Sequence, residues 1–422
     1  MDRRLYCIFA ALILLAAFVL RLGGAAVLER FTASHGEARF FFGDSDSYWQ
    51  LGRALATGAP YEHDEERRWQ VFRMPGYPLV LAPLFWVSDD PPVRAARFEN
   101  VFLGTLTVLL TGWAALAIFR DRWVALWGMG FVAVLPELVV QSAVVLSEEL
   151  SCVLNLALLL AAVALARNHF SARWGACVGF FWALGVYARP DALLLPPFVA
   201  CVTFLFPDAR RFVARYARRA GVSLIVAFAV FSALMTPWWI RNVRLTGRFV
   251  PTTLQVGASL YDGLSPTADG GSDMAFVDRF RDELDRAIDS EGNRNGEFYE
   301  ARLDRTMKDA ALRWAKENPG KAIRLAGVKF LRLWNVVPNE PAFSNPAAKW
   351  TIFLSFTPLL LAALWGVWKF RGVPLARLLW IPAAYITLLH MIFVASLRYR
   401  APILPELTIL AAAALFMPPH RR

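Results

Sequence analysis

The chain has 422 residues, of which 57% are hydrophobic and only 19% are charged, and its mean hydropathy is +0.41. A soluble domain carries about a quarter charged residues, so these values and the long apolar runs exclude a soluble protein. They indicate a protein that crosses a membrane many times. The four cysteines lie in apolar runs with no paired spacing and no nearby histidine, which argues against a disulfide framework or a zinc site.

Apolar runs of about 20 residues predict transmembrane helices, and the chain contains ten candidates. They lie at about 5–22, 98–119, 123–140, 147–166, 174–189, 191–206, 220–240, 350–368, 377–395 and 402–418. The fifth and sixth are short and meet at Arg189-Pro190-Asp191, which allows a tight helical pair that does not fully cross. No cleavage-site pattern follows the first run, so we expect an uncleaved first span.

The placement of Lys and Arg predicts the orientation, because these residues gather in cytoplasmic loops. With a cytoplasmic N-terminus, the inner segments and Arg377 hold 16 Lys and Arg against three acidic residues. This excess accounts for the whole net charge of +11, so the charge indicates topology rather than nucleic-acid binding. Both termini are expected in the cytoplasm. The inner segments are 1–4, 120–122, 167–173, 207–219, 369–376 and 419–422.

Two long polar segments, 23–97 and 241–349, are then expected on the outer face. We predict three domains: an N-terminal transmembrane module that includes the first outer segment (1–240), the outer helical segment (241–349) and C-terminal spans (350–422). The stretch from Gly76 to Val87 is too short for a span and predicts an interfacial helix, with Tyr77 and Trp86 at the headgroup level. Helical patterns follow at 274–290, 297–317 and 321–335. The prediction is therefore an all-α polytopic membrane protein with about ten spans.

The most informative motifs lie in the first outer segment. One is 43–49 (Gly-Asp-Ser-Asp-Ser-Tyr-Trp), and the other is 73–78 (Arg-Met-Pro-Gly-Tyr-Pro). Carboxylates beside a bilayer are costly unless they are solvated or used. Further along the chain, Ser-Glu precedes the fourth span, Arg-Pro-Asp joins two short spans, and Arg-Tyr-Arg precedes the last span.

In their order and sidedness, these motifs resemble the GT-C class of integral-membrane glycosyltransferases. The similarity is greatest to the branch of the protein mannosyltransferases and lipid A aminoarabinose transferases. The resemblance implies a GT-C fold and an inverting transfer of a sugar from a polyprenyl-phosphate carrier to an acceptor hydroxyl on the outer face. The expected partners are the carrier-linked donor, a lipid, glycan or protein acceptor, and the bilayer of a plasma or inner membrane.

The same resemblance implies roles for individual residues. Asp44 matches the first-loop catalytic aspartate, Arg73 the basic residue next to the carrier phosphate, and Glu148 the acid at the outer end of the fourth span. Asp46 is expected to help Asp44. The pattern lacks a clear Asp-x-Asp metal set beyond these two aspartates, so no cofactor is expected and a divalent metal is the less favoured alternative.

Further side chains are expected to bind substrate, because a carrier phosphate needs cationic donors. They are Tyr48, Arg73, Tyr77, Arg189, Arg398, Tyr399 and Arg400. Structural readings compete with several of these roles. Asp44 or Asp46 can cap a helix, Glu148 can stabilise a helix dipole, and Arg189 can pair with Asp191 across the turn between two short helices. His63 has no spaced partner and is expected at the surface.

A second function class stays open: a lipid-linked sugar transporter or a membrane scaffold without enzymatic activity. Transporters usually show inverted repeats with broken spans in matching positions. A broken pair is indicated only near Pro190, and the polar residues gather at the outer ends of spans rather than at the midplane. A pocket that opens to both the lipid and the outer face and is lined by Asp44 favours the enzyme, and a central pathway that reaches both sides favours transport.

Overall fold

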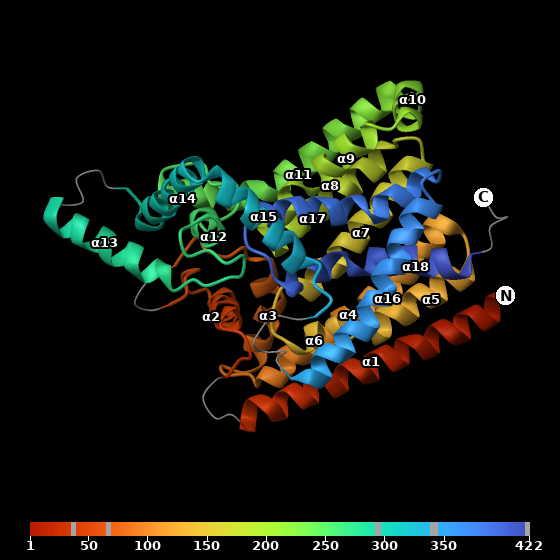
Figure 1. Ribbon diagram of the computed structural model, residues 1–422, viewed down its shortest axis with the longest axis horizontal. Helices are drawn as coiled ribbons and strands as arrows, with labels where there is room; N and C mark the ends of the chain where they lie inside the picture. Colours follow the sequence, from red (N-terminus) through yellow and green to blue (C-terminus); the bar gives the residue numbers. More distant parts are fainter. Residues whose placement is uncertain (35–38, 65–68, 292–296, 338–344, 418–422) are drawn as a thin grey trace.

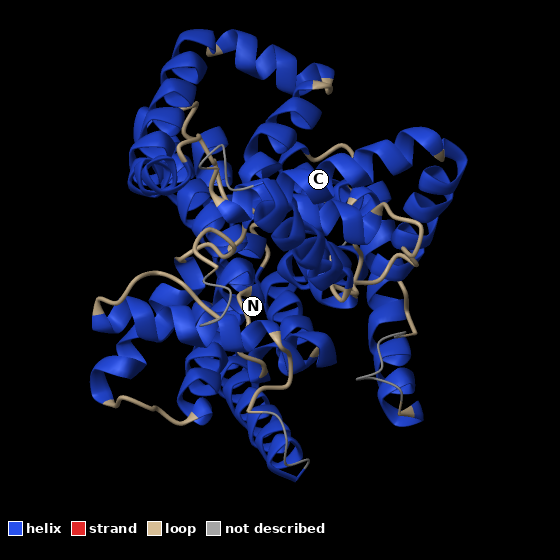
Figure 2. Cartoon of the chain, turned by 90° about the vertical axis from the view of Figure 1, so that its left-hand side faces the viewer, coloured by secondary structure: helices blue, strands red, loops and turns tan. Residues whose placement is uncertain are grey.

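The structure is a computed structural model that describes residues 1–34, 39–64, 69–291, 297–337 and 345–417. Every named element in these ranges is a helix, as Figures 1 and 2 show. The expected all-α fold is therefore confirmed for the described part of the chain.

Seven helical stretches in the described ranges are long and apolar enough to cross a membrane. They are α1 (Arg3–Ser34), α4 (Val93–Phe119), α7 (Glu148–Arg167), α11 (Ala217–Thr246), α16 (Pro346–Lys369), η3 (Pro374–Leu379) with α17 (Ile381–Ile392), and η4 (Leu397–Ile403) with α18 (Leu404–Phe416). Two bent pairs raise the number to nine if each pair forms one span. They are α5 (Arg122–Val134) with α6 (Pro136–Ala143), and η1 (Pro190–Leu194) and α9 (Leu195–Phe204) with α10 (Pro207–Arg215).

The expected number of about ten spans is thus higher than the seven to nine in the described residues. Three of the expected spans account for the difference. The run 123–140 is broken, 174–189 forms the short helix α8 (Ala172–Ala188), and 191–206 turns sharply into α10. The first span also continues to Ser34, so the first outer segment begins later than residue 23.

Proline accounts for the break between α5 and α6, which are bent by 56°. Pro136 has no N–H to donate and clashes with the preceding turn. Carbonyl groups freed near such a break need a donor, because lipid offers none. Arg21 of α1 supplies it, with Nη1 3.1 Å from the carbonyl oxygen of Ala133 and Nη2 2.9 Å from that of Val132.

The first outer segment contains α2 (Asp44–Thr57) and α3 (Gly76–Val87). The expected interfacial helix has the predicted bounds, and Trp86 is exposed. Tyr77 was expected at the headgroup level as well, but it is completely buried and donates a hydrogen bond to Asn100 at 3.1 Å. A Cβ atom on Gly76 would lie 2.4 Å from the carbonyl of Tyr187, so glycine allows α3 to begin directly against the end of α8.

The described residues of the second outer segment include the helices α12 (Val256–Gly263), α13 (Phe276–Glu291), α14 (Tyr299–Glu317) and α15 (Pro319–Leu333). The last three confirm the helical patterns that the sequence predicted. Trp69 and Phe72 of the first outer segment pack into an apolar core with Leu303 and Met307 of α14. The two outer segments therefore form one packed unit.

This unit lies at one end of the helix bundle, on the left in Figure 1, with α2, α12, α13 and α14 together. The N-terminus of α1 and helix α10 lie at the other end. At that end the carbonyl of Met1 accepts a hydrogen bond from Arg122, and Lys369 donates to the carbonyl of Met417. The expected inner segments therefore gather away from the outer unit, except for 419–422, which lies outside the described residues.

Candidate active site

Asp44 is the first residue of α2, and its carboxylate lies between two arginines from distant parts of the chain. Arg73 Nη2 lies 2.6 Å from Oδ1, and Arg398 Nη2 lies 2.6 Å from Oδ2. The N-cap position of α2 is Gly43, and no side chain caps this end. Asp44 therefore does not cap α2.

A second carboxylate lies behind the first. Glu148 begins α7, is 2% exposed, and lies 3.0 Å from Arg189 Nη1 and 3.8 Å from Arg398 Nε. Arg189 also contacts Asp191 at 3.0 Å, as the alternative of a pair across this turn predicted. Arg398 bridges the two carboxylates. We call Asp44, Arg73, Glu148, Arg189 and Arg398 the Asp44 cluster.

Aromatic rings border the Asp44 cluster on two sides. The ring of Tyr399 lies below two guanidinium groups, 5.1 Å from Arg398 and 5.6 Å from Arg189. Arg73 lies over the ring of Tyr48 at 5.2 Å, and the Tyr48 hydroxyl is 3.4 Å from Ser147 Oγ. Cations attract the faces of such rings, so Tyr48 and Tyr399 help to hold the arginines.

The charges of the cluster control the ionisation of Asp44. Burial by itself raises the pKa of this carboxyl group, but the charges of Arg73 and Arg398 and their hydrogen bonds outweigh burial. The net effect is a pKa well below the usual range of an aspartate. Asp44 is therefore an anion at every physiological pH, and its basicity is low as long as both arginines hold it.

A cavity of about 1050 Å³ begins at Asp44 and extends beneath the second outer segment. Asp44, Asp46 and Arg73 line it together with Glu300 and Asp304 of α14. A pocket of this volume holds a molecule of the size of a sugar or a short peptide. The Asp44 cluster therefore faces an open space rather than a sealed core.

Two of the predicted site residues take other positions. The side chain of Asp46 accepts a hydrogen bond from Gln50 at 2.6 Å and lines the cavity without joining the arginines. Tyr77 is fully buried and supports Tyr48, with the two ring centroids 5.2 Å apart. It therefore lies behind the cluster.

Arg400 was expected beside Arg398 as a substrate-binding residue, but its side chain is 0% exposed and lies elsewhere. It pairs with Glu137 and donates to the carbonyl oxygens of Leu333 and Asn335, at 3.0 and 2.9 Å. The physical reason is the 3₁₀ geometry of η4. With three residues per turn, side chains two positions apart diverge by roughly 120°. We call Arg400 and these partners the Arg400 brace.

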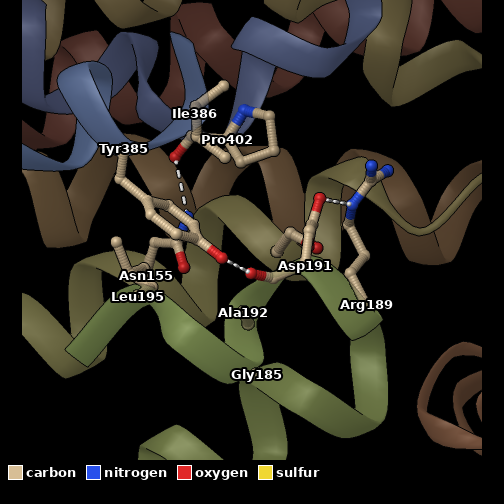
Figure 3. Close-up of a pocket in the computed structure, with 10 residues that line it drawn as sticks. Asn155, Gly185, Arg189, Asp191, Ala192, Leu195, Tyr385, Ile386 and Pro402 are labelled. Atoms are coloured by element: carbon tan, nitrogen blue, oxygen red, sulfur yellow. Dashed lines mark hydrogen bonds and ion pairs between the residues drawn. The ribbon is translucent and has the colours of Figure 1, made fainter. Parts of the chain in front are cut away.

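A small cavity of about 10 Å³ behind Arg189 has room for about one water molecule. Figure 3 shows its polar lining, in which the Tyr385 hydroxyl donates to the backbone carbonyl of Asp191. On another wall Asn155 donates to the carbonyl of Pro402 at 3.3 Å. These bonds connect α7, η1, α17 and η4, and they fix the turn from which Arg189 reaches Glu148.

Sequence reasoning missed the part of the large cavity that α14 lines. Glu300 and Asp304 lie one helical turn apart on α14, in a segment whose mixed charges indicated a solvated surface. His63, expected at the surface, is half-buried and also lines the cavity. The spacing of Glu300, Leu303, Asp304 and Met307 on one helical face was the available signal.

The described ranges contain no group of three or more His, Cys, Asp and Glu side chains placed to hold a metal ion. The sequence-based expectation that no cofactor takes part was not tested by this observation, and it stays a prediction.

Part of the chain matches a known protein family. The family model of dolichyl-phosphate-mannose-protein mannosyltransferases matches residues 72–187, the part of the chain that runs from just before Arg73 to just before Arg189. A comparison of the sequence with curated proteins gives no match.

Solved structures with the same arrangement of helices include two of an oligosaccharyltransferase from Archaeoglobus fulgidus. The enzyme AglB, in complex with an inhibitory peptide and a dolichol-phosphate, has a TM-score of 0.55 and 12% identity over 97% of this chain and 50% of its own. The form tethered with an acceptor peptide has a TM-score of 0.57 and 12% identity over 98% of this chain and 49% of its own. The chain thus spans about half the length of these relatives. The GT-C fold expected from the motifs is confirmed.

A further structure, ArnT from Cupriavidus metallidurans bound to undecaprenyl phosphate, has 15% identity over 97% of this chain and 78% of its own. Its TM-score of 0.41 is too low to support an argument about the fold.

Proposed function

We propose that this GT-C membrane protein transfers a sugar from a polyprenyl-phosphate carrier to an acceptor hydroxyl, with inversion and with Asp44 as the general base. The observation that carries this proposal is the position of Asp44 between two arginines at the edge of a large cavity. Support for the carrier comes from the matched family model, whose name contains dolichyl-phosphate-mannose.

The reaction takes place on the outer face of a plasma or inner membrane, with both termini in the cytoplasm. This orientation is supported by the separation of the arginine-rich α10 and the N-terminus from the end that contains the Asp44 cluster. Lys and Arg in short loops favour the cytoplasmic side.

The arginines of the cluster bind the carrier phosphate, since guanidinium groups bind phosphate oxygens through paired hydrogen bonds. Arg73 and Arg398 are held by Asp44 when no donor is bound. An arriving phosphate competes for the same two guanidinium groups and displaces the carboxylate. Asp44 then loses the two charges that lower its pKa, and its basicity increases when the donor is in place.

The chemical step is a displacement at the anomeric carbon. The acceptor oxygen forms a bond to that carbon while the bond from the carbon to the phosphate oxygen breaks. The electron pair leaves on the phosphate, where Arg73 and Arg398 stabilise the developing charge. The proton of the acceptor hydroxyl passes to the Asp44 carboxylate.

The cavity favours this reaction over transport or a scaffold role. Its lining comes from the first outer segment and from the second, with α12, α13 and α14. These elements lie together at one end of the bundle (Figure 1). A site confined to one end suits an acceptor that arrives from the outer face.

The first experiment measures binding of undecaprenyl phosphate and dolichyl phosphate to the purified protein by native mass spectrometry. We expect Arg73→Gln and Arg398→Gln to weaken binding at least about tenfold, since each removes a charge-assisted contact of roughly 1.5–3 kcal/mol. Asp44→Asn removes the competing carboxylate and should bind the carrier at least as tightly as the wild type. Arg39→Gln is the matched control, because Arg39 pairs with the exposed Asp90 outside the cluster.

The second experiment follows transfer of label from a panel of polyprenyl-phosphate sugars in membranes that contain each variant. Asp44→Asn should lower the rate by about 10²–10⁴-fold while its carrier binding persists. Wild-type turnover in Asp44→Asn would exclude Asp44 as the base. Absence of carrier binding by the wild type would exclude the donor class.

A further inference from the structure

The segment that carries Arg73 is held by a carboxylate from the second outer segment. Glu300 of α14 accepts two backbone hydrogen bonds, from Gln70 N to Oε1 at 2.5 Å and from Val71 N to Oε2 at 3.1 Å. Glu300 is 230 residues from Gln70 in the sequence and is 2% exposed. Each carboxylate oxygen therefore has one backbone partner, two and three residues before Arg73.

The carbonyl groups of the same segment are held from other elements. Arg241 of α11 donates to the carbonyl of Gln70 at 2.9 Å, and Leu254 N donates to that of Val71 at 2.9 Å. The hydroxyl of Tyr61 donates to the carbonyl of Arg73 at 3.2 Å. Among these contacts, only the two to Glu300 depend on a group that gains or loses a proton near neutral pH.

Side-chain packing transmits the position of this backbone to the Arg73 guanidinium. Phe72 packs against the apolar core of α14, and Arg73 lies over its ring at 5.0 Å. Arg73 then reaches Asp44 at 2.6 Å. Movement of residues 70–72 away from α14 would therefore move the guanidinium relative to Asp44.

We propose that Glu300 is a positioning residue, whose ionised carboxylate clamps residues 70 and 71 and thereby places Arg73 at the carrier phosphate. This role rests on the function proposed above. In Glu300→Gln one acceptor oxygen is replaced by an NH2 group that faces one of the two N–H donors. The clamp then loses one of its two bonds and Arg73 loses its fixed position.

Protonation of Glu300 falls within an accessible range. Burial raises the pKa of this carboxyl group to about 7, and the N–H groups of Gln70 and Val71 and the charge of Arg241 oppose the rise. A raised pKa means that the ionised carboxylate is less stable in the closed clamp than in water, so the free energy of opening the clamp decreases as the pH rises from about 4.5 to about 7 and is constant above that range. Asp44 does not titrate there, because its pKa is lowered.

Other charged groups face the same space. Besides Asp44 and Arg73, they are Asp304 of α14, Asp278 of α13, Arg241 of α11, and Asp46, Arg53, Glu62, His63 and Asp64 of the first outer segment. Burial lowers the pKa of His63 to about 4, so His63 is neutral over the range in which Glu300 titrates. Burial raises the pKa of Asp304, whose side chain accepts from Gly257 N at 2.6 Å. Asp304 thus holds α12 rather than the Arg73 segment.

The test measures amide hydrogen exchange in the peptide that contains residues 69–73, in the full-length protein between pH 5.5 and 8.5, corrected for intrinsic exchange. In the wild type we expect protection of the Gln70 and Val71 amides to fall by up to about tenfold per pH unit as the pH rises from 5.5 to about 7, and to stay constant above that pH. In Glu300→Gln, which has no charge and only one acceptor oxygen, protection should be lower than in the wild type and independent of pH. Asp304→Asn is the matched control and should keep the pH dependence of the wild type.

Binding of undecaprenyl phosphate provides the functional readout at the same pH values. Glu300→Gln should weaken binding about tenfold at pH 8, where Glu300 of the wild type is ionised. Equal carrier binding by wild type and Glu300→Gln, with the exchange difference intact, would overturn the positioning role and leave the donor class standing. Unchanged exchange in Glu300→Gln would overturn the clamp itself, whether or not any carrier binds.

Discussion

Arg398 and Arg400 are two residues apart on one 3₁₀ helix, yet they belong to two regions of different character. In the Asp44 cluster the side chains of Arg73, Arg398 and Asp44 are 13%, 22% and 32% exposed. In the Arg400 brace the arginine is 0% exposed and Glu137 is 10% exposed. The arginine–carboxylate pairs are accessible to a ligand in the Asp44 cluster and inaccessible in the Arg400 brace.

The difference shows why an arginine near a motif is not by itself a binding residue. A guanidinium group that exchanges a carboxylate partner for a phosphate must be accessible to solvent. Separation of its ion pair must also cost little free energy. The brace meets neither condition, because removal of one partner from a buried pair leaves an unpaired charge. Arg400 instead joins α6, α15 and η4, and thereby holds the helix on which Arg398 is placed.

The largest stability effect is expected from Arg400→Ala. It leaves Glu137 buried without its partner, which costs about 3–5 kcal/mol, and it removes the two bonds to the ends of α15. Arg398→Ala should cost much less, because its site is open to solvent. Thermal unfolding in detergent, with carrier binding measured in parallel, separates the two. If Arg398→Ala destabilised the protein as strongly as Arg400→Ala, the distinction between the regions would be wrong.

A double replacement sharpens the same comparison. Arg400→Met with Glu137→Leu removes both charges of the brace and fills the space with apolar atoms, which is often neutral for a buried pair. We expect the double variant to be about 2 kcal/mol more stable than Arg400→Ala. A double variant as unstable as the single one would show that the bonds to Leu333 and Asn335 dominate the brace.

The pH dependence of stability tests the charge of Asp44. Its folded-state pKa lies below the value of about 3.8 in the unfolded chain, so its ion pairs contribute stability above that pH and lose it as the pH falls towards the folded-state pKa. The difference in melting temperature between wild type and Asp44→Asn should therefore be constant from pH 9 to 5 and shrink below about pH 4. A difference that changed near pH 7 would assign Asp44 a raised pKa.

The smallest effect is expected at an exposed pair. Arg39 and Asp90 are 2.6 Å apart, but their side chains are 43% and 77% exposed. Asp90→Asn should change stability by less than about 1 kcal/mol, and high salt should remove the difference. A larger effect would mean that the exposed fraction of an arginine pair does not predict its contribution to the stability of this protein.

Much of the helical architecture was predictable from apolar runs. The bounds of α3 and the helices of 274–290 and 297–317 were confirmed. The structure also brings Asp44, Arg73, Glu148, Arg189 and Arg398 together through ion pairs. Their catalytic and binding roles remain predictions, with the experiments described above as their tests.

Other features depend on contacts that no local pattern contains. The direction of Arg400 follows from the helical geometry of η4, on which side chains two positions apart diverge by roughly 120°. Glu300 lies in a helix of mixed charge, which indicates a solvated face when only local spacing is considered. Its partners, Gln70 and Val71, are recognisable only once α14 is known to cover them.

The bonds from Arg21 to the broken end of α5 have a consequence for the biogenesis of the protein. An arginine in the middle of a lone first span costs about 2.5–3.5 kcal/mol at insertion, and its acceptors, the carbonyls of Val132 and Ala133, are made more than a hundred residues later. We expect α1 to become stably inserted in the bilayer only after α5 has emerged from the ribosome. Truncated nascent chains that end before and after residue 150 should differ in the membrane retention of this first helix.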